Sequence, residues 1–138
     1  MKVRVDIFMK FVFVGQNILG GLTLKELIKD NKVPSFVITR KSDNYPNLVE
    51  ETALAHKILV YKTSDINKGK GIMQKLSDLK PDIIFCSAWG NIIKEPLLKI
   101  PRLGWVNFHP SFLPTYKGSS PLTWQLINGE EFGGCTAH

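Results

Sequence analysis

The sequence predicts an α/β fold, a three-layer sandwich in which helices cover both faces of a mostly parallel, twisted sheet. Two observations predict it. Short apolar runs that suit strands buried on both faces alternate along the chain with segments of helical spacing. Hydrophobic residues make up 43% of the 138 residues, enough for one packed core. Strand and helix in strict alternation are typical of a parallel sheet, because parallel strands need crossover connections.

Five segments are predicted to be strands, and a sixth begins near the last residue. Each is rich in apolar or β-branched residues and is bounded by glycine, proline or a polar stretch. They are Phe11–Val14, Phe36–Thr39, Ile58–Tyr61, Ile83–Cys86, Gly104–Phe108 and Gly133–His138.

The first two helices are predicted from local signals. The stretch from Thr23 to Glu26 has the pattern of a capping box, so we expect the first helix to start at Thr23 and Gly15–Gly21 to form a loop. Pro46 is expected to begin the second helix, with Leu48, Thr52 and Ala55 on its buried side.

The three later helices follow from spacing and from start and stop residues. One is predicted by the helical spacing of Ile72, Met73, Leu76 and Leu79, and a short one is predicted over Ile93–Lys99. In the last, Ser120 is expected to cap the N-terminus, Pro121 to take the first helical position and Asn128-Gly129 to end the helix.

Composition excludes several classes of protein. Cys86 and Cys135 are too few for a disulfide scaffold and lack the spacing of zinc ligands, so we expect a reduced, cytoplasmic protein without a metal. The sequence contains no run of 18 apolar residues, which a helix would need to span a membrane. The net charge of +6 lies entirely within residues 1–80, which hold fourteen Lys and Arg against eight Asp and Glu. This excess weakly favours an anionic partner such as a phosphate, polyglutamate or nucleic acid. We prefer the interpretation of solvated helix faces, because no basic cluster alternates with aromatic residues.

The glycines after the first predicted strand suggest a dinucleotide-binding loop, but the pattern is incomplete. Gly15–Gly20 lacks the second glycine that lets the backbone approach a pyrophosphate, and no lysine of a phosphate-binding loop follows. Nucleotide binding is therefore kept only as a disfavoured hypothesis.

A polar cluster follows the fifth predicted strand. Ligands of Rossmann-like sheets bind beyond the carboxyl ends of the strands. Asn107 and His109 are two residues apart at such an end, so we expect their side chains to point the same way. An amide can stabilise a developing oxyanion and an imidazole can transfer a proton near neutral pH. The pair therefore predicts an acyl-type transfer site with Asn107 and His109 as catalytic residues.

These residues carry a family resemblance. The segment from Asn107 to Gly118 has the form Asn-x-His-x-Ser-x-Leu-Pro-x-x-x-Gly, which resembles the signature of folate-dependent formyltransferases. The stretch from Lys80 to Ile84 is similar to the entry of the family's fourth strand, and Met9-Lys10-Phe11 is similar to its usual start. The resemblance implies a catalytic domain over residues 9–138, preceded by an N-terminal extension of residues 1–8.

The resemblance also implies a cosubstrate and its site. The donor would be 10-formyltetrahydrofolate, and the acceptor a primary amine. The loop after the fourth strand would hold the pterin largely through backbone groups, with the Trp89 ring as a wall of the pocket; its residues are Ser87, Ala88, Trp89, Gly90, Asn91 and Ile92. His138 matches a position near the family's site that is not catalytic there.

Two acceptors stay open. The segment Gly118–Trp124 resembles the methionyl-tRNA formyltransferase and sugar N-formyltransferase branches, which implies methionyl-tRNA or an amino-sugar nucleotide. Residues 15–18 do not match the phosphate loop of the glycinamide ribonucleotide branch. The sequence predicts no oligomeric state.

One expected residue is missing. The family uses an Asp in an Asp-x-Gly segment after the strand that begins here at Gly133, and the sequence ends before it. We therefore expect the front part of a domain truncated at its C-terminal end. The alternative is a catalytically inactive remnant that binds folate or a partner.

Overall fold

A computed structural model describes residues 9–41 and 47–138; the expected extension, residues 1–8, and Pro46 lie outside them. The described strands form one sheet of order β3-β2-β1-β4-β5-β6, in which only β6 is antiparallel to its neighbour. The strands are β1 (Phe11–Gly15), β2 (Val37–Arg40), β3 (Val60–Thr63), β4 (Ile83–Ser87), β5 (Trp105–His109) and β6 (Thr136–Ala137). The helices are α1 (Asn17–Lys29), α2 (Leu48–Ala55), α3 (Lys70–Leu79), α4 (Glu95–Leu98) and α5 (Pro121–Ile127).

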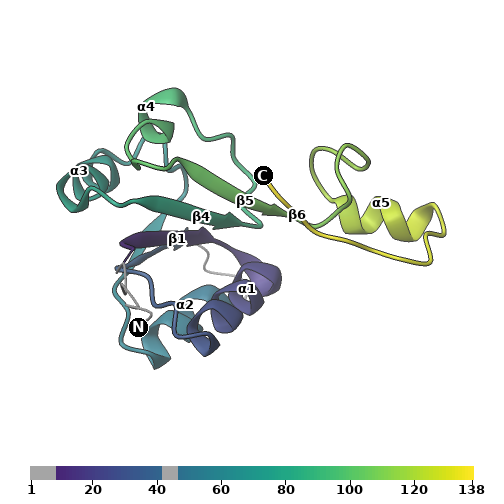
Figure 1. Cartoon of the computed structure of the whole chain (residues 1–138), viewed down its shortest axis with the longest axis horizontal. Helices are drawn as coiled ribbons and strands as arrows, with labels where there is room; N and C mark the ends of the chain where they lie inside the picture. Colours follow the sequence, from purple (N-terminus) through teal and green to yellow (C-terminus); the bar gives the residue numbers. More distant parts are fainter. Residues whose placement is uncertain (1–8, 42–46) are drawn as a thin grey trace, which may run out of the picture.

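The predicted three-layer α/β sandwich is confirmed. Helices α1 and α2 cover one face of the sheet, and α3 and α4 cover the other (Figure 1). Side chains of a strand alternate between the two faces, so β1 supplies both cores. Val12 and Val14 pack with Leu76 on one side, whereas Phe13 packs with Leu24 on the other. Because both faces are covered, the strands are nearly continuous apolar runs.

The predicted start of α1 is wrong. The helix begins at Asn17, and Thr23 lies inside it, with its hydroxyl donating to the Leu19 carbonyl at 2.9 Å. Much of the expected loop Gly15–Gly21 is therefore helical. Gly20 and Gly21 are buried, and α2 packs so close to Gly21 that a Cβ there would lie 2.4 Å from Leu48. These glycines allow two helices to approach closely, which the sequence pattern alone does not distinguish from a loop.

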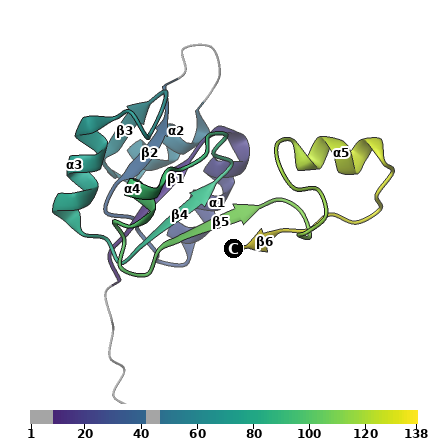
Figure 2. The same cartoon turned by 90° about the horizontal axis from the view of Figure 1, so that it is seen from above.

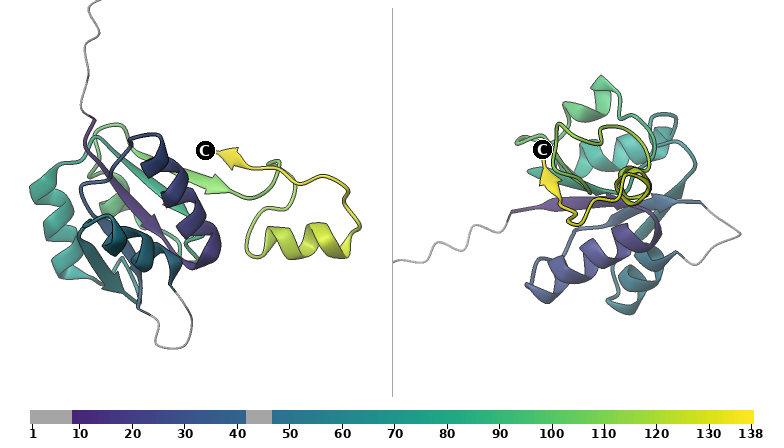
Figure 3. Two further views of the ribbon diagram at one scale, coloured as in Figure 1. Left: turned by 90° about the horizontal axis from the view of Figure 1, so that it is seen from below. Right: turned by 90° about the vertical axis from the view of Figure 1, so that its right-hand side faces the viewer.

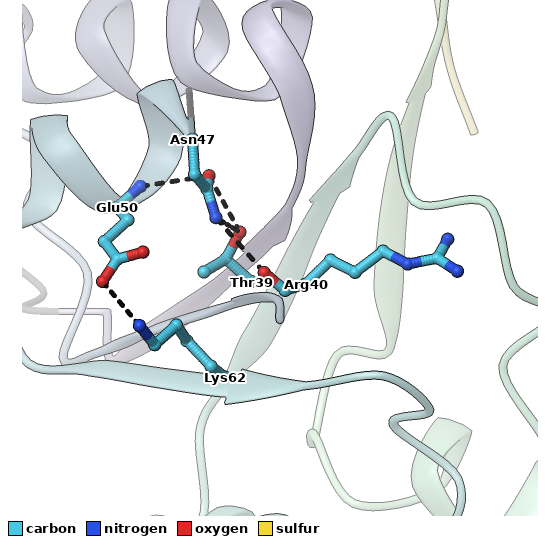
Figure 4. A network of polar contacts seen from close by, with 5 residues as sticks. All are labelled: Thr39, Arg40, Asn47, Glu50 and Lys62. Carbon is cyan, nitrogen blue, oxygen red and sulfur yellow. Dashed lines mark hydrogen bonds and ion pairs between the residues drawn. The ribbon is translucent and has the colours of Figure 1, made fainter. Parts of the chain in front are cut away.

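Helix α2 is fixed to the sheet by a polar network (Figure 4). Asn47 caps it by accepting from the Glu50 amide at 3.3 Å, and donates through Nδ2 to Thr39 Oγ1 at 3.0 Å and to the Arg40 carbonyl at 3.3 Å. Glu50 pairs with Lys62 of β3 at 2.9 Å. The network joins the helix to the ends of two adjacent strands.

The predicted buried side of α2 is partly wrong. Val49, Thr52 and Ala53 are buried, whereas Ala55 is exposed. Thr52 belongs to both the predicted and the observed face, and Val49 lies three residues before it and four before Ala53, so the three share one side of the helix.

The last two helices differ from expectation in detail. Helix α4 is shorter than Ile93–Lys99, and α5 starts at Pro121 as predicted, but the Ser120 hydroxyl makes no capping hydrogen bond. Ser120 has φ 57°, outside the extended region from which a side chain usually caps. Beyond the end of β5, α5 and its flanking loops project from the rest of the molecule (Figures 2 and 3). No helix of the described residues is long and apolar enough to cross a membrane.

We predict that Gly21→Ala lowers the free energy of unfolding by about 1–3 kcal/mol, because the new methyl group would overlap Leu48. Urea unfolding measures the change. Gly71→Ala in α3 is the matched control: a Cβ there meets nothing within 4 Å, so stability should rise by up to about 1 kcal/mol. Equal effects of the two substitutions would contradict the close-approach explanation.

Candidate active site

The candidate site lies at the carboxyl end of β5. Asn107 and His109 are two residues apart on this strand and share one of its faces. Asn107 pairs in register with Cys86 of β4, which belongs to the core beneath α3 and α4. Phe108, between them, faces the opposite side and stacks on Phe85 with ring centroids 5.8 Å apart. Both polar side chains are partly exposed.

Strand β6 brings a third polar side chain to this place. Asn107 and His138 exchange two backbone hydrogen bonds, of 2.7 and 3.0 Å. Asn107 Nδ2 also donates to His138 Nε2 at 3.1 Å, and the His138 ring lies edge-on to His109 with centroids 6.3 Å apart. The structure thus brings Asn107, His109 and His138 together. Periodicity along β5 predicted only the first two, since the contact with His138 depends on the pairing of β6.

The imidazole of His109 is held by the loop that follows. His109 Nε2 donates to the carbonyl oxygen of Tyr116 at 2.9 Å. Tyr116 has φ 54°, a left-handed backbone conformation that residues other than glycine rarely adopt. This unusual backbone turn directs the Tyr116 carbonyl back toward the end of β5.

Internal hydrogen bonds hold this loop, residues 110–118. The Ser111 hydroxyl, fully buried, donates to the Thr115 carbonyl at 2.8 Å. Thr136 of β6 donates to the Ser111 carbonyl at 2.7 Å and accepts from the Leu113 amide at 3.0 Å. Gln125 of α5, also buried, donates to the Pro110 carbonyl at 2.9 Å. The loop is thus tied to both segments that follow it in the chain.

The other predicted site residues form the loop after β4. Ser87 is buried, and its hydroxyl lies 2.9 Å from that of Thr23, so its side chain faces α1 and not the side of His109. Ala88 has φ 55°, and Trp89 packs against the core beneath α3 and α4 with its indole N–H buried and without a partner.

The second half of that loop is more open. Gly90 is exposed, Asn91 is partly exposed and Ile92 is 86% exposed. Asn67 braces this part, since its Nδ2 donates to the Ile92 carbonyl and its Oδ1 accepts from the Lys94 amide, both at 2.8 Å. The loop thus presents an accessible surface on a backbone held by hydrogen bonds.

The described residues hold no group of three or more His, Cys, Asp or Glu side chains that could bind a metal ion. A pocket of about 430 Å³ lies elsewhere, at the opposite edge of the sheet from β5. Helix α2 and the segment leading into β3 line it, through Glu50, Leu54, Lys57, Ile58, Leu59, Val60 and Lys62.

Comparisons with known proteins identify the family. The family model described as Formyl transferase matches residues 9–138. The bifunctional polymyxin resistance protein ArnA of Wigglesworthia glossinidia brevipalpis is 42% identical over 94% of this chain, which covers 20% of that protein. Methionyl-tRNA formyltransferase of Clostridium beijerinckii is 34% identical over 93% of this chain, which covers 44% of it. The chain thus spans less than half the length of these relatives.

Solved structures share the fold. Glycinamide ribonucleotide transformylase 1 of Symbiobacterium toebii superposes with a TM-score of 0.75 at 18% identity, covering all of this chain and 69% of that one. The class is thus a Rossmann-like α/β domain with a polar cluster at the carboxyl end of its sheet. The chain belongs to the formyl transferase family, as the sequence signature indicated.

We predict that Cys86 resists alkylation at pH 8, whereas Cys135 reacts. Burial raises the pKa of the Cys86 thiol to about 12, although an amide hydrogen bond from Trp89 opposes the shift, so its reactive thiolate is scarce. Cys135 is exposed. Mass spectrometry after iodoacetamide treatment should find one modification, which Cys135→Ser removes. Rapid labelling of Cys86 in the folded protein would contradict the burial.

Proposed function

We propose that residues 9–138 form the part of a formyltransferase domain that transfers a formyl group from 10-formyltetrahydrofolate to a primary amine. The observation that carries the proposal is that Asn107 and His109 lie together at the carboxyl end of β5, where both contact His138, within a chain of the formyl transferase family. A reduced, cytoplasmic setting fits such a reaction and belongs to the same proposal.

The reaction needs a site for negative charge. The amine nitrogen attacks the formyl carbon, and the carbonyl oxygen becomes an oxyanion. The carbon–nitrogen bond to the folate then breaks, and the folate nitrogen takes up a proton. The Asn107 amide has two N–H groups, of which His138 Nε2 accepts one. The other is free to stabilise the oxyanion, a type of contact that strengthens as charge develops.

His109 would move the proton. The attacking amine must lose a proton and the leaving nitrogen must gain one, which an imidazole near neutral pH can mediate. His109 Nε2 is occupied by the Tyr116 carbonyl, so the transfer falls to Nδ1.

The donor would lie against the loop of Ser87, Ala88, Trp89, Gly90, Asn91 and Ile92. This loop follows β4, which neighbours β5, so its residues are close in the sheet to Asn107. Backbone groups of its exposed half, from Gly90 to Ile92, are the part most able to reach a pterin. The acceptor is proposed to be methionyl-tRNA or an amino-sugar nucleotide.

We expect His109→Ala to reduce the turnover number by about 10²–10⁴, the range that general acid–base catalysis supplies. Transfer of a radiolabelled formyl group from the folate to the amine measures it in the intact protein. His56→Ala is the matched control, since His56 is an exposed residue at the end of α2. A turnover number equal to that of the unaltered protein, with an unchanged circular dichroism spectrum, would refute the role of His109.

We expect Asn107→Asp to lower the turnover number by about 10²–10³. The substitution keeps the size of the side chain but removes both N–H donors and adds negative charge where an oxyanion would form. A loss confined to the Michaelis constant of the folate would instead indicate a role in binding.

The same assay distinguishes the acceptors and tests the proposal as a whole. Label recovered on aminoacyl-tRNA supports one acceptor, and label on an amino-sugar nucleotide supports the other. Retention of tetrahydrofolate in equilibrium dialysis with no transfer to either amine would favour the inactive folate-binding alternative. Absence of both folate binding and transfer would overturn the proposed function.

A further inference from the structure

The contact between His109 and Tyr116 determines where the imidazole proton lies. A backbone carbonyl oxygen carries no hydrogen and can only accept. At 2.9 Å the Tyr116 oxygen therefore requires a proton on His109 Nε2. A neutral imidazole has one N–H, so its lone pair is then on Nδ1.

We propose that Tyr116 is a positioning residue, whose backbone carbonyl holds His109 in the Nε2-protonated form and whose hydroxyl, bound to Glu130, keeps that carbonyl in place. The role of this tautomer in catalysis rests on the proposed function, whereas the tautomer itself does not.

The side chain of Tyr116 is anchored to a distant part of the chain. Its hydroxyl donates to Glu130 Oε1 at 2.5 Å and accepts from Asn128 Nδ2 at 3.1 Å. Both partners follow α5, where the Glu130 amide donates to the Gln125 carbonyl at 3.0 Å. Through these contacts the end of the α5 segment is linked back to the loop that carries the carbonyl.

The backbone conformation of Tyr116 needs a supporting contact. A residue other than glycine at φ 54° is in a conformation that is unfavourable by itself and persists where surrounding contacts impose it. The Ser111 hydroxyl also lies 3.4 Å from the Tyr116 oxygen, but it has a closer acceptor in Thr115 at 2.8 Å. Without the bond to Glu130 we expect the peptide after Tyr116 to rotate and its carbonyl to leave His109.

The negative charge of Glu130 also favours the protonated Tyr116 hydroxyl, which is the form that donates the hydrogen bond. The hydrogen bond to the Glu130 carboxylate raises the pKa of the Tyr116 hydroxyl, against a smaller opposite effect of Asn128. A tyrosine hydroxyl keeps its proton near neutral pH in any case, and the raised pKa extends the pH range over which it donates to Glu130.

The test is nitrogen NMR of the intact protein with ¹⁵N-labelled histidine, at a pH where His109 is neutral. His109→Gln assigns the signals of that ring. We expect Nε2 to carry the proton in the unaltered protein. In Tyr116→Phe and Glu130→Ala the ratio of the Nε2–H to the Nδ1–H form should fall by about fivefold, the factor expected for loss of one hydrogen bond. A proton on Nδ1 in the unaltered protein would overturn the inference.

Three further variants separate anchoring from general structure. Glu130→Gln keeps an acceptor for the Tyr116 hydroxyl and should retain the original ratio. Glu131→Ala, at the exposed neighbouring position, is the control and should also retain it. Tyr116→Gly removes the hydroxyl but also the strain of the left-handed backbone, so it should retain more of the Nε2–H form than Tyr116→Phe does. Preservation of the ratio in Tyr116→Phe would show that the anchor has no effect and would refute the proposal.

Kinetics add a readout linked to the proposed function. Tyr116→Phe should lower the turnover number by about fivefold while the Michaelis constants stay within about twofold, because the hydroxyl acts on His109 and not on bound substrate. If His109→Ala retained full turnover, the proposed function would fail while the NMR result for Tyr116 would still stand.

Discussion

Burial of both faces of the sheet is the constraint on which the structure depends. Each strand of the parallel region must present apolar side chains alternately to two helical layers, so β1 and β4 cannot change register without moving polar groups into a core. This constraint also orients the candidate site. Once Val106 and Phe108 are assigned to one face of β5, Asn107 and His109 necessarily share the other, at the point where the strand leaves the covered region.

The candidate site is supported by the sheet on one side and by β6 and the following loop on the other. Strand β5 positions its two polar residues through the sheet, while β6 and the loop of residues 110–118 determine their hydrogen-bond partners. Side chains of Ser111, Gln125 and Thr136 hydrogen-bond the loop backbone, and the first two are buried, where polar groups need such partners. Such support is what a site needs if reacting groups are to stay in position without stabilisation by substrate.

Relatives and fold contribute different information. The family match concerns residues 9–138 and identifies the kind of protein, whereas structural neighbours of about 20% identity establish only that the fold is shared. The chain covers less than half the length of the two sequence relatives named above. The polar groups at the end of β5 belong to this chain itself, and their contacts are observed independently of any relative.

Periodicity and local signals by themselves determined the alternation of strands and helices along the chain and the two-sided core. They also determined that Asn107 and His109 share one face of a strand. Each of these depends on residues close in sequence. The start of α1 was missed because glycines that permit helix packing and glycines that form loops look alike until Leu48 of α2 is in place. The contacts of Asn107 with His138, of His109 with Tyr116 and of Tyr116 with Glu130 were decided only by the tertiary structure. They join segments whose approach depends on an antiparallel edge strand and a left-handed turn, and neither leaves a periodic pattern in the sequence.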